Sequence, residues 1–505
     1  MNLSTHTAIA IGLGIYACMM LGMSAYWMTR IKKSADYLVA GRGLPFWVVT
    51  GTVTAGSIGT GCVIGAPGLA YLHGWAGSAY PIGLGLGTVI VGLLFARTRR
   101  FRFMTLGEEI ACYYGGNRIV AEFSNLSLFL SQLGWLTVQI IGCGSVLSAV
   151  TGLRLRLCIV LAGLIMAAIS IPGGFKTVAY TDFLNAGILV GGFTALTVSA
   201  LHHADGLTGL RHAVPPPYFS VLGVASYGHW AIATLMLTLV FSVVADPGRR
   251  LAMYSARKET SARWGTALAG TVVMVFSVSI GIAGMYAFRL NPHLASPDEA
   301  LPWIVVSVLP AWLAGVVVVS MTAAILSCAN ANAAAVGTFF VRHIYPLATR
   351  GNYPRRPVAV VRLILVCAFV ASTTLALHAG TIVSFVMKFL PITMSGLAII
   401  ILVAHFWSRA TWQGAVAGLA VTPAISIAGL FVRVGPDAWT NPTVLAAAAG
   451  TLALIGVSLA TKRENLTFEE VAARLARERD AVEGEPHGGV QHAETTAQPL
   501  EVRRK

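Results

Sequence analysis

The chain has 505 residues, of which 56% are hydrophobic and only 11% are charged, and its mean hydropathy is +0.73. Soluble domains average about 25% charged residues, so this composition excludes a soluble globular protein and predicts an all-α polytopic membrane protein. The net charge of +15 comes from short basic clusters between apolar segments, which is typical of cytoplasmic loops and argues against a nucleic-acid partner.

Thirteen segments are apolar enough to cross a bilayer, since each crossing needs about 20 such residues. The predicted spans are residues 8–28, 46–72, 77–96, 119–150, 157–171, 183–202, 226–245, 265–288, 311–340, 363–379, 381–405, 413–432 and 442–460. No Lys or Arg precedes the first segment and basic residues follow it, so it is expected to be a span rather than a signal peptide. Most of the 35 Lys and Arg residues fall in loops on one side, which predicts an N-terminus outside and a cytoplasmic C-terminus.

The segment 52–68, TVTAGSIGTGCVIGAPG, combines five glycines and one proline within a predicted span. A membrane helix tolerates such residues where freed backbone groups find partners in protein or in a wet cavity. Unwound carbonyls at mid-membrane would form a cation site with a substrate cavity beside it. The alternative is that these small residues only allow close helix packing.

Two further features concern the cysteines and the C-terminal tail. The seven cysteines lie in or beside apolar segments without a paired pattern or CxxC spacing, so we expect no structural disulfide and no zinc site. Residues 461–505 form a polar tail in which the sequence from Thr467 to Glu470 predicts a capping box. A short charged helix to about Arg479 should follow, with disorder from Ala481 onward.

Four motifs occur in an order that resembles the sodium:solute symporter family, with its bacterial branches as the nearest match. They are DYLVAGRGLP at 36–45, GGFKTVAYTD at 173–182, AAILSC at 323–328 with a following HIY at 343–345, and FWSRATWQGAVAG at 406–418. The resemblance implies the leucine-transporter fold, in which a five-helix repeat is followed by an inverted copy of itself.

The resemblance divides the chain into a transmembrane domain, 1–460, and the tail. Repeat one would be 46–202 and repeat two 226–405, with the extra helix 8–28 before them and two final helices in 413–460. The first helix of each repeat should be broken near the membrane midplane. The segment 226–245 has no Gly or Pro between His229 and Ala245, so whether it is broken stays open.

The function implied by the resemblance is secondary active transport, with sodium-coupled symport of a small polar organic solute by alternating access. Its partners would be that solute, sodium and the lipid bilayer of a bacterial inner membrane, and the chain would act as a monomer or weak oligomer. No cofactor is expected apart from sodium as the coupling ion. Alternatives are a proton-coupled or uncoupled permease and a transporter-like membrane sensor. No catalytic motif indicates an enzyme.

The family's sodium ligands can be carried over by motif. Its backbone carbonyls fall on Ala55, Ile58 and Ala324, and its first hydroxyl falls on Ser327. The second hydroxyl position is Cys328, and a thiol is a soft, poor sodium ligand. Alternatively, these two side chains are ordinary packing residues.

The carboxylate of Asp182 corresponds to one near the family's sodium exit path. Its alternative role is a helix N-cap for the span 183–202. Polar side chains elsewhere in the predicted spans are candidates for the substrate cavity: Ser57, Cys62, Gln132, Gln139, Ser242 and Lys388.

Three of these candidates carry a specific expectation. Gln132 and Gln139 lie two turns apart on one helix face, so they either line the cavity or join helices. Lys388 is a basic residue inside a span and would suit a carboxylate-bearing solute, unless its side chain reaches outward to the membrane surface. The basic run from Asp246 to Arg263 is expected to contact lipid headgroups first and to act in gating second.

Overall fold

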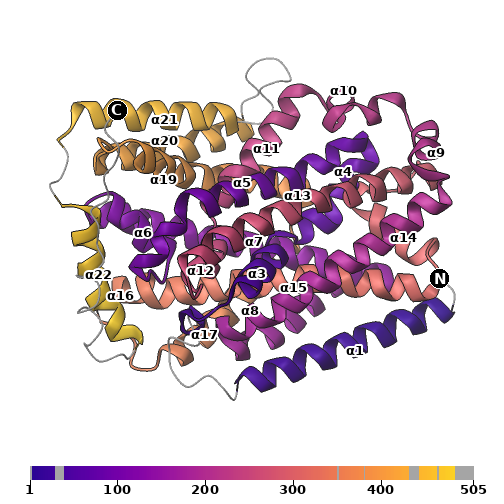
Figure 1. Ribbon diagram of the computed structural model, residues 1–505, viewed down its shortest axis with the longest axis horizontal. Helices are drawn as coiled ribbons and strands as arrows, with labels where there is room; N and C mark the ends of the chain where they lie inside the picture. Colours follow the sequence, from indigo (N-terminus) through magenta and orange to yellow (C-terminus); the bar gives the residue numbers. More distant parts are fainter. Residues whose placement is uncertain are drawn as a thin grey trace.

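The computed structural model describes residues 3–28, 39–349, 352–379, 382–431, 443–462 and 466–483. Within these residues the chain forms helices and no strand, and one isolated bridge joins Leu44 to Ala256. Most helices run along the long axis of the molecule (Figure 1). The expected residues Asp36–Leu38 of the first motif and the end of the tail, 484–505, lie outside the described residues.

The first half of the chain forms helices joined by short turns. Its α-helices are α1 (Leu3–Met28), α3 (Phe46–Ser57), α4 (Ala66–His73), α5 (Ala79–Phe95), α6 (Leu106–Tyr113), α7 (Arg118–Thr151), α8 (Leu155–His203) and α9 (Gly206–Ala213). Shorter turns link them: η1 (Ala40–Arg42), η2 (Gly61–Gly65), η3 (Gly74–Ser78) and η4 (Ala96–Phe101). The two spans predicted at 157–171 and 183–202 fall within the single helical element α8.

The second half of the chain contains further long helices and several short connecting ones. Its α-helices are α10 (Val224–Tyr227), α11 (His229–Val244), α12 (Pro247–Tyr254), α13 (Glu259–Leu290), α14 (Ala300–Ser307), α15 (Ala311–Phe339), α16 (Tyr345–Ala348), α17 (Pro357–Ala376), α18 (Ile382–Leu390), α19 (Gly396–Phe406), α20 (Trp412–Phe431), α21 (Thr443–Ala460) and α22 (Phe468–Glu483). The remaining turns are η5 (Pro216–Phe219), η6 (Val221–Gly223), η7 (Pro297–Glu299), η8 (Phe340–Ile344) and η9 (Pro391–Ser395).

Among the described residues, 9 helices are long and apolar enough to cross a membrane, or up to 10 if the bent pair α11 and α12 is one span. The count of thirteen predicted spans is therefore not confirmed. One physical reason is that broken spans are divided into pieces, and α3 and α11 have only 12 and 16 residues. Each is shorter than the roughly 20 residues that a crossing needs.

The first break lies where the glycine pattern predicts it. Helix α3 ends at Ser57, and Ile58 adopts a non-helical conformation (φ −100°, ψ 79°). The chain then enters η2, a π-helical turn, before α4 begins at Ala66. Turns of this type often mark functional sites within helices. Segment 52–68 is therefore not one regular helix.

The second break lies at the end of α11, just beyond the segment 226–245 in which the sequence left a break open. Helix α11 is continuous to Val244, and α12 begins at Pro247 after a bend of 43°. Proline suits the first turn of a helix because its missing N–H needs no partner there. Asp246 caps the new helix by accepting hydrogen bonds from the amides of Gly248 and Arg249. The open question about segment 226–245 is thus answered by a break just after it.

Helix α12 corrects one expectation. The sequence analysis assigned the run after Asp246 to a cytoplasmic loop with lipid-headgroup contacts. Instead, Arg249 and Arg250 are 6% and 0% exposed. Both have carboxylate partners within the bundle, at 3.1 Å for Arg250 and Glu109. The lipid-headgroup interpretation of these two arginines was therefore wrong.

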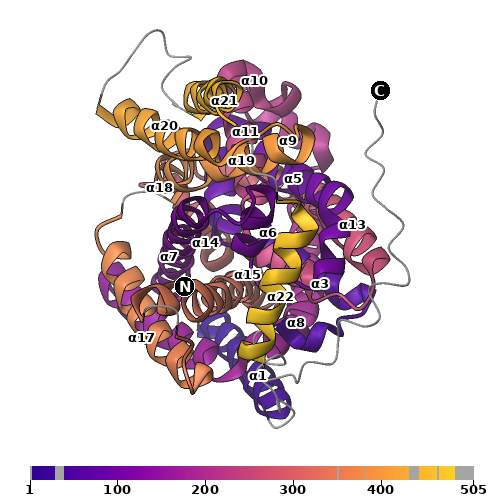
Figure 2. The same ribbon diagram turned by 90° about the vertical axis from the view of Figure 1, so that its left-hand side faces the viewer.

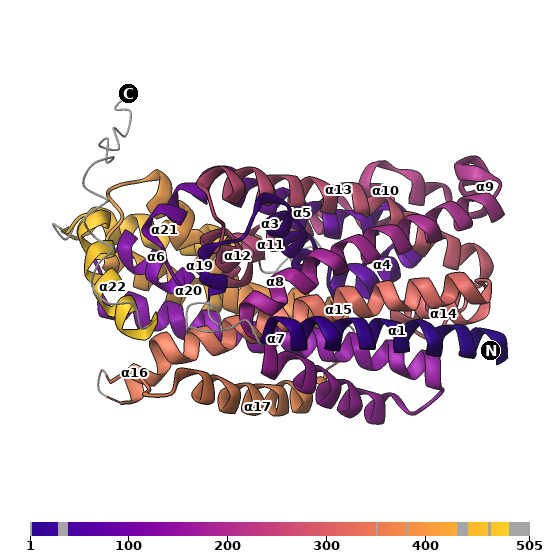
Figure 3. The same ribbon diagram turned by 60° about the horizontal axis from the view of Figure 1, so that its bottom comes forward.

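Helix α15 is central to the bundle, where it packs against α1, α3, α7 and α8. Helix α1 lies at the outer edge of the bundle, and its first residues are at the end opposite to α22 (Figure 3). Helix α22 crosses one end of the bundle (Figure 2) and contacts α6. The capping box predicted at its start is present, since Thr467 and Glu470 exchange hydrogen bonds of 2.7 and 3.3 Å. The helix continues to Glu483, slightly beyond the predicted end.

Candidate substrate and ion site

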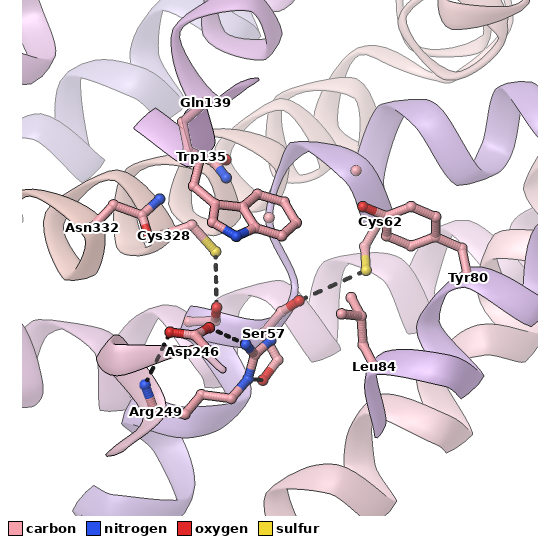
Figure 4. Close-up of a pocket in the computed structure, with 13 residues that line it drawn as sticks. Ser57, Cys62, Tyr80, Leu84, Trp135, Gln139, Asp246, Arg249, Cys328 and Asn332 are labelled. Carbon is pink, nitrogen blue, oxygen red and sulfur yellow. Dashed lines mark hydrogen bonds and ion pairs between the residues drawn. The ribbon is translucent and has the colours of Figure 1, made fainter. Parts of the chain in front are cut away.

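A small cavity lies beside the break in the first span. Its volume is about 30 Å³, which is room for one or two waters. Five helices contribute to its lining together with the break itself, as Figure 4 shows for most of these side chains. The lining residues are Gly56, Ser57, Gly59, Gly61, Cys62, Tyr80, Leu84, Trp135, Gln139, Asp246, Arg249, Cys328 and Asn332.

Gln139 on α7 supplies the partner that the broken backbone needs. In a continuous helix the Thr60 amide would donate to the Gly56 carbonyl, four residues earlier. It donates instead to Gln139 Oε1 at 3.0 Å, and the Thr60 hydroxyl donates to the same atom at 2.9 Å. Gln139 therefore lines the cavity and also joins two helices.

Gly59 brings the neighbouring helices close to the break. A Cβ at this position would lie 2.7 Å from Cys328 Sγ and 2.9 Å from Gln139 Nε2. Real Cβ atoms are essentially never found so close to another heavy atom. Glycine is therefore required here for close approach rather than for its backbone flexibility.

Cys328 on α15 faces the carbonyls at the end of α3. Its thiol donates to the carbonyl oxygens of Ala55 and Gly56, over 3.4 and 3.2 Å. Ala324 and Ile58, which were assigned the other two carbonyl ligands, are both fully buried. The structure thus brings α15 and the break together, and the thiol hydrogen lies where a cation would have to compete with it.

Asp182 is a buried carboxylate without a normal hydrogen bond. It is 0% exposed, and neither carboxylate oxygen has a hydrogen-bond partner among the described residues. Ser327 and Asn185 lie near enough to this carboxylate to interact with its charge, although neither makes a hydrogen bond of ordinary distance and angle with it. The Ser327 hydroxyl is likewise buried and unpartnered within the described chain. Asp182 lies well inside α8, so its alternative role as an N-cap was wrong.

The unpartnered oxygens of Asp182 and Ser327 fit a hard cation. An ionised carboxylate buried without a partner costs a great deal of free energy, so such groups are paired, bind a cation or become protonated. Sodium and other hard ions prefer oxygen ligands, and two carboxylate oxygens and one hydroxyl are available here. The Thr52 hydroxyl donates to the Ala179 carbonyl at 3.0 Å, which holds α3 against α8 close to this cluster.

Arg249 connects the two breaks. Its Nε donates to the Ser57 hydroxyl at 3.0 Å, and its Nη1 makes an ion pair with Asp246. Ser57 is the last residue of α3, whereas Asp246 and Arg249 belong to the start of α12. One guanidinium therefore spans from the second broken helix to the first, as Figure 4 shows.

The other predicted cavity residues divide into two groups. Cys62 lines the cavity, and its thiol donates to the Ser57 carbonyl at 3.8 Å. Gln132 is buried elsewhere in α7, where its Nε2 donates to Ser131, and Ser242 donates within α11. Lys388 is exposed on α18 and does not line the cavity. The structure therefore brings Ser57, Cys62 and Gln139 together at the cavity but not the remaining three.

Six cavity residues were not predicted from the sequence: Tyr80, Leu84, Trp135, Asp246, Arg249 and Asn332. Only Asp246 and Arg249 had a sequence signal, because Asp-Pro-Gly is a typical helix start. Trp135 lies in an apolar helix, where nothing in the sequence separates a cavity-facing aromatic residue from a lipid-facing one. Its indole nitrogen and the Tyr80 hydroxyl are both buried without a partner among the described residues.

Two glutamates on α6 hold buried arginines from other helices. Arg250 of α12 pairs with Glu109, and its guanidinium lies 3.9 Å from the centre of the Phe95 ring. Arg342 of η8 pairs with Glu108 at 2.7 Å. These charges are buried, but each has an opposite partner, as burial requires. They fix α6 between the second broken helix and the end of α15.

The chain is similar to known transporters in both sequence and structure. The profile of the sodium:solute symporter family matches residues 37–422. The sodium/pantothenate symporter of Escherichia coli K12 is 25% identical over 424 residues, which cover 80% of this chain and 87% of that protein. The sodium/glucose cotransporter of Vibrio parahaemolyticus is 24% identical over 463 residues, covering 80% and 82% of the two chains.

Among solved structures, a Na⁺-coupled sialic acid symporter in a substrate-bound outward-open state matches with a TM-score of 0.76. The alignment has 19% sequence identity and covers 92% of this chain and 99% of the other. MhsT in complex with L-phenylalanine matches with a TM-score of 0.52 and 12% identity, covering 82% and 97%. At these identities the structural matches establish the leucine-transporter fold.

Proposed function

We propose that this chain, which belongs to the sodium:solute symporter family, couples sodium movement to the transport of a small polar organic solute by alternating access. The observation that carries the proposal is the buried pair of Asp182 and Ser327 beside a transmembrane helix broken at Ile58. Their unpartnered oxygens could bind a cation inside the bundle, and the adjacent cavity could bind the solute.

Sodium would be bound by oxygen atoms from the end of α3 and from α15. We assign the carbonyls of Ala55, Ile58 and Ala324 and the hydroxyl of Ser327 to this role, with Asp182 as a nearby anionic group on the ion path. The sequence-based assignment made Cys328 a sodium ligand. We do not retain it as a ligand, because its thiol donates to carbonyls near the end of α3 that a cation would use. We propose that it weakens sodium binding rather than contributing a ligand.

Alternating access would use the two breaks as hinges. Helices divided near the midplane can move in halves while the site between them stays intact. The bond from Arg249 to Ser57 joins the second broken helix to the end of α3. If either half-helix moves alone, this hydrogen bond must break; if it persists, the two half-helices must move together. Solute binding at this bond could therefore influence gating.

The test is uptake by proteoliposomes containing the purified chain, with an inward sodium gradient or with N-methylglucamine in its place. Labelled solutes of several classes are screened, and the sodium gradient is expected to stimulate uptake of at least one of them. Asp182→Asn and Ser327→Ala should each lower the apparent sodium affinity of that uptake. Gradient-independent uptake of every transported solute would refute sodium coupling.

A second candidate is proton coupling at the same site. It is favoured by the same buried carboxylate, since an unpaired Asp182 can be neutralised by a proton as well as by a cation. A pH gradient without sodium would then drive uptake, and Asp182→Asn would abolish the pH dependence. Sodium-driven uptake that a protonophore leaves unchanged would exclude this candidate.

The expected setting is a bacterial inner membrane, with the N-terminus outside and the C-terminus in the cytoplasm. The basic loops support this orientation, as does the position of α22 at the end opposite to the start of α1. We propose that the chain acts as a monomer or weak oligomer. Labelling of single cysteines introduced at Ser4 and at Glu469 with an impermeant reagent would test the orientation.

A further inference from the structure

The cavity has an unequal supply of hydrogen-bond donors and acceptors. The Trp135 indole nitrogen is only a donor, and it is buried without a partner among the described residues. The Tyr80 hydroxyl, which can donate, is in the same situation. Gln139 uses its carbonyl oxygen for Thr60, which leaves its NH₂ group as the part that is free to bind a ligand.

Arg249 adds a cationic donor to this set. A guanidinium has five N–H groups and no acceptor. Its Nε and Nη1 are used by Ser57 and Asp246, and Nη2 has no hydrogen-bond partner among the described residues. Arg249 lines the cavity, and the nitrogen-bearing edge of Trp135 faces the side of the cavity where Arg249 and Ser57 lie (Figure 4).

The carboxylate in the cavity, by contrast, is already occupied. Asp246 Oδ1 accepts the amides of Gly248 and Arg249, at 2.7 and 3.4 Å. Its Oδ2 accepts from the Arg249 guanidinium. A cationic or amine-bearing solute would therefore compete with Arg249 for Asp246 and would meet the guanidinium charge at close range.

We infer that the cavity selects a small solute carrying one carboxylate, whose oxygens accept from Arg249, Trp135 and Gln139. The inference rests on the proposed transport function and names the substrate class of that same cavity. A carboxylate is an acceptor-only group, and its hydrogen bonds to a guanidinium are charge-assisted. A polyol or sugar would need acceptors as well as donors for its hydroxyl groups. Asp246 and Gln139 use their side-chain oxygens within the protein, which leaves the Asn332 amide oxygen and the Tyr80 hydroxyl as the side-chain acceptors at the cavity.

Charge balance favours one carboxylate rather than a dianion. Arg249 and Asp246 cancel each other, and Asp182 would cancel one bound sodium, so these four charges sum to zero and each negative charge on the solute would be added to a neutral surrounding. A second negative charge would be buried without a partner, which is costly. The side chains of Leu84 and Cys62 offer apolar contact to a short hydrocarbon portion. Because the cavity is only about 30 Å³, it has to widen as the solute enters.

The test measures binding to the full chain in lipid nanodiscs by thermal shift and by quenching of tryptophan fluorescence. The probes are acetate, propionate, lactate and pyruvate, each compared with its primary amide, in sodium and in N-methylglucamine buffers. At least one carboxylate should bind in sodium at least tenfold more tightly than its amide. Glucose, urea and inorganic sulfate serve as neutral and dianionic comparisons.

Variants assign the effect to the cavity. Arg249→Gln should weaken carboxylate binding at least tenfold, Arg249→Lys less, and Trp135→Phe severalfold, because the last removes only the N–H donor. Arg156→Gln removes an exposed arginine near the start of α8 and should leave the affinity unchanged. If Arg249→Gln fails to fold, the affinity of Trp135→Phe for the carboxylate decides the test.

The inference is overturned if no carboxylate binds, if an amide, glucose or sulfate binds as tightly as the best carboxylate, or if the Trp135 and Arg249 variants bind normally. In each case sodium-driven uptake of a neutral solute by proteoliposomes would still support the proposed transport function. Carboxylate binding that depends on Arg249, without sodium-driven uptake of any solute, would instead support the inference and refute the transport function.

Discussion

The sulfur of Cys328 lies 3.2 Å from the carbonyl oxygen of Gly56, so a thiol from α15 donates to the last turn of α3 just before the helix breaks. The same thiol also lies 3.4 Å from the Ala55 carbonyl. Of these two oxygens, that of Ala55 is one of the carbonyls proposed to bind sodium, and that of Gly56 is its neighbour in the chain. If sodium binds at the break as proposed, this donor competes with it for the Ala55 carbonyl.

Replacing Cys328 by serine should strengthen sodium dependence. A hydroxyl is a harder ligand than a thiol and can turn its lone pair toward the ion. The gain of one such contact predicts a two- to tenfold lower half-saturating sodium concentration, at roughly 0.5–1.5 kcal/mol per contact. Sodium titration of uptake measures the change. Cys328→Ala, which supplies no ligand, is the matched control, and equal values for the serine and alanine variants would contradict the assignment.

Removing the charge of Asp182 should weaken sodium binding. Asp182→Asn keeps the shape of the side chain but removes the anion, and the loss should be about tenfold or more, since interactions of charged groups exceed roughly 1.5 kcal/mol. Stabilisation of the purified protein by sodium, read as a shift in Tm, gives the affinity without transport. Thr181→Val is a matched control because the Thr181 hydroxyl bonds only to carbonyls of its own helix. An unchanged sodium response in Asp182→Asn would place the ion elsewhere.

Adding one methyl group at Gly59 should abolish transport. The new Cβ would lie within 3 Å of Cys328 Sγ and Gln139 Nε2, so the contacts that hold the break would have to shift. Overpacking of this kind costs about 1–3 kcal/mol. Gly187→Ala, in α8, meets nothing within 4 Å and should leave uptake unaffected. Normal uptake by Gly59→Ala would show that this close approach is not required.

Helix α22 should detach when its aromatic anchor is removed. The Phe468 ring lies 5.0 Å from that of Phe101 and 5.1 Å from that of Tyr113, which joins the tail to the bundle. Truncation of a packed phenylalanine costs about 3–5 kcal/mol in a well-packed core, so Phe468→Ala should speed trypsin cleavage after Arg474 and Arg477 severalfold. Leu466→Ala, at an exposed neighbouring position, should not. Equal cleavage rates would show that Phe468 does not anchor the helix.

The start of α22 should also loosen in acid. Hydrogen bonds from the backbone amide and hydroxyl of Thr467 lower the pKa of Glu470 below its ordinary value. Because the folded state lowers this pKa, the capping bonds contribute fully at neutral pH and are lost as pH falls below about 4. Hydrogen exchange of the first turn, corrected for the intrinsic pH dependence, should rise in this range. Glu470→Gln should remove most of the pH dependence, and a persistent rise in that variant would assign it to another group.

The sequence predicts the first break well and the second poorly, for a physical reason. Several glycines and a proline within an apolar span disfavour a continuous helix, so the sequence predicts the interruption near Ile58. The break before Pro247 follows an ordinary apolar helix, and the charged residues after it resemble a loop. Only the packed structure shows that Arg249 and Asp246 neutralise each other and can therefore be buried.

The cavity lining illustrates the same limit. Gln139 could be identified as a candidate from the sequence because a buried amide needs partners. Its actual partner, Thr60, could not be predicted. Lys388 shows the converse, since a charged residue within an apolar helix can face the cavity or the outside, and only packing of α18 places it outward. Trp135 carries no sequence signal because its role depends on which way its helix face turns.

The hydroxyl of Tyr16 donates to the side-chain oxygen of Asn185 at 3.1 Å, so the extra first helix reaches the amide that neighbours Asp182. Most of α1 is unburied, and the helix lies at the outer edge of the bundle, where a surrounding bilayer would contact it. A thicker or thinner bilayer that slid α1 along its axis would pull on this phenol–amide link. A change in lipid composition could thereby act mechanically on Asp182 through α1, a helix at the outer edge of the bundle.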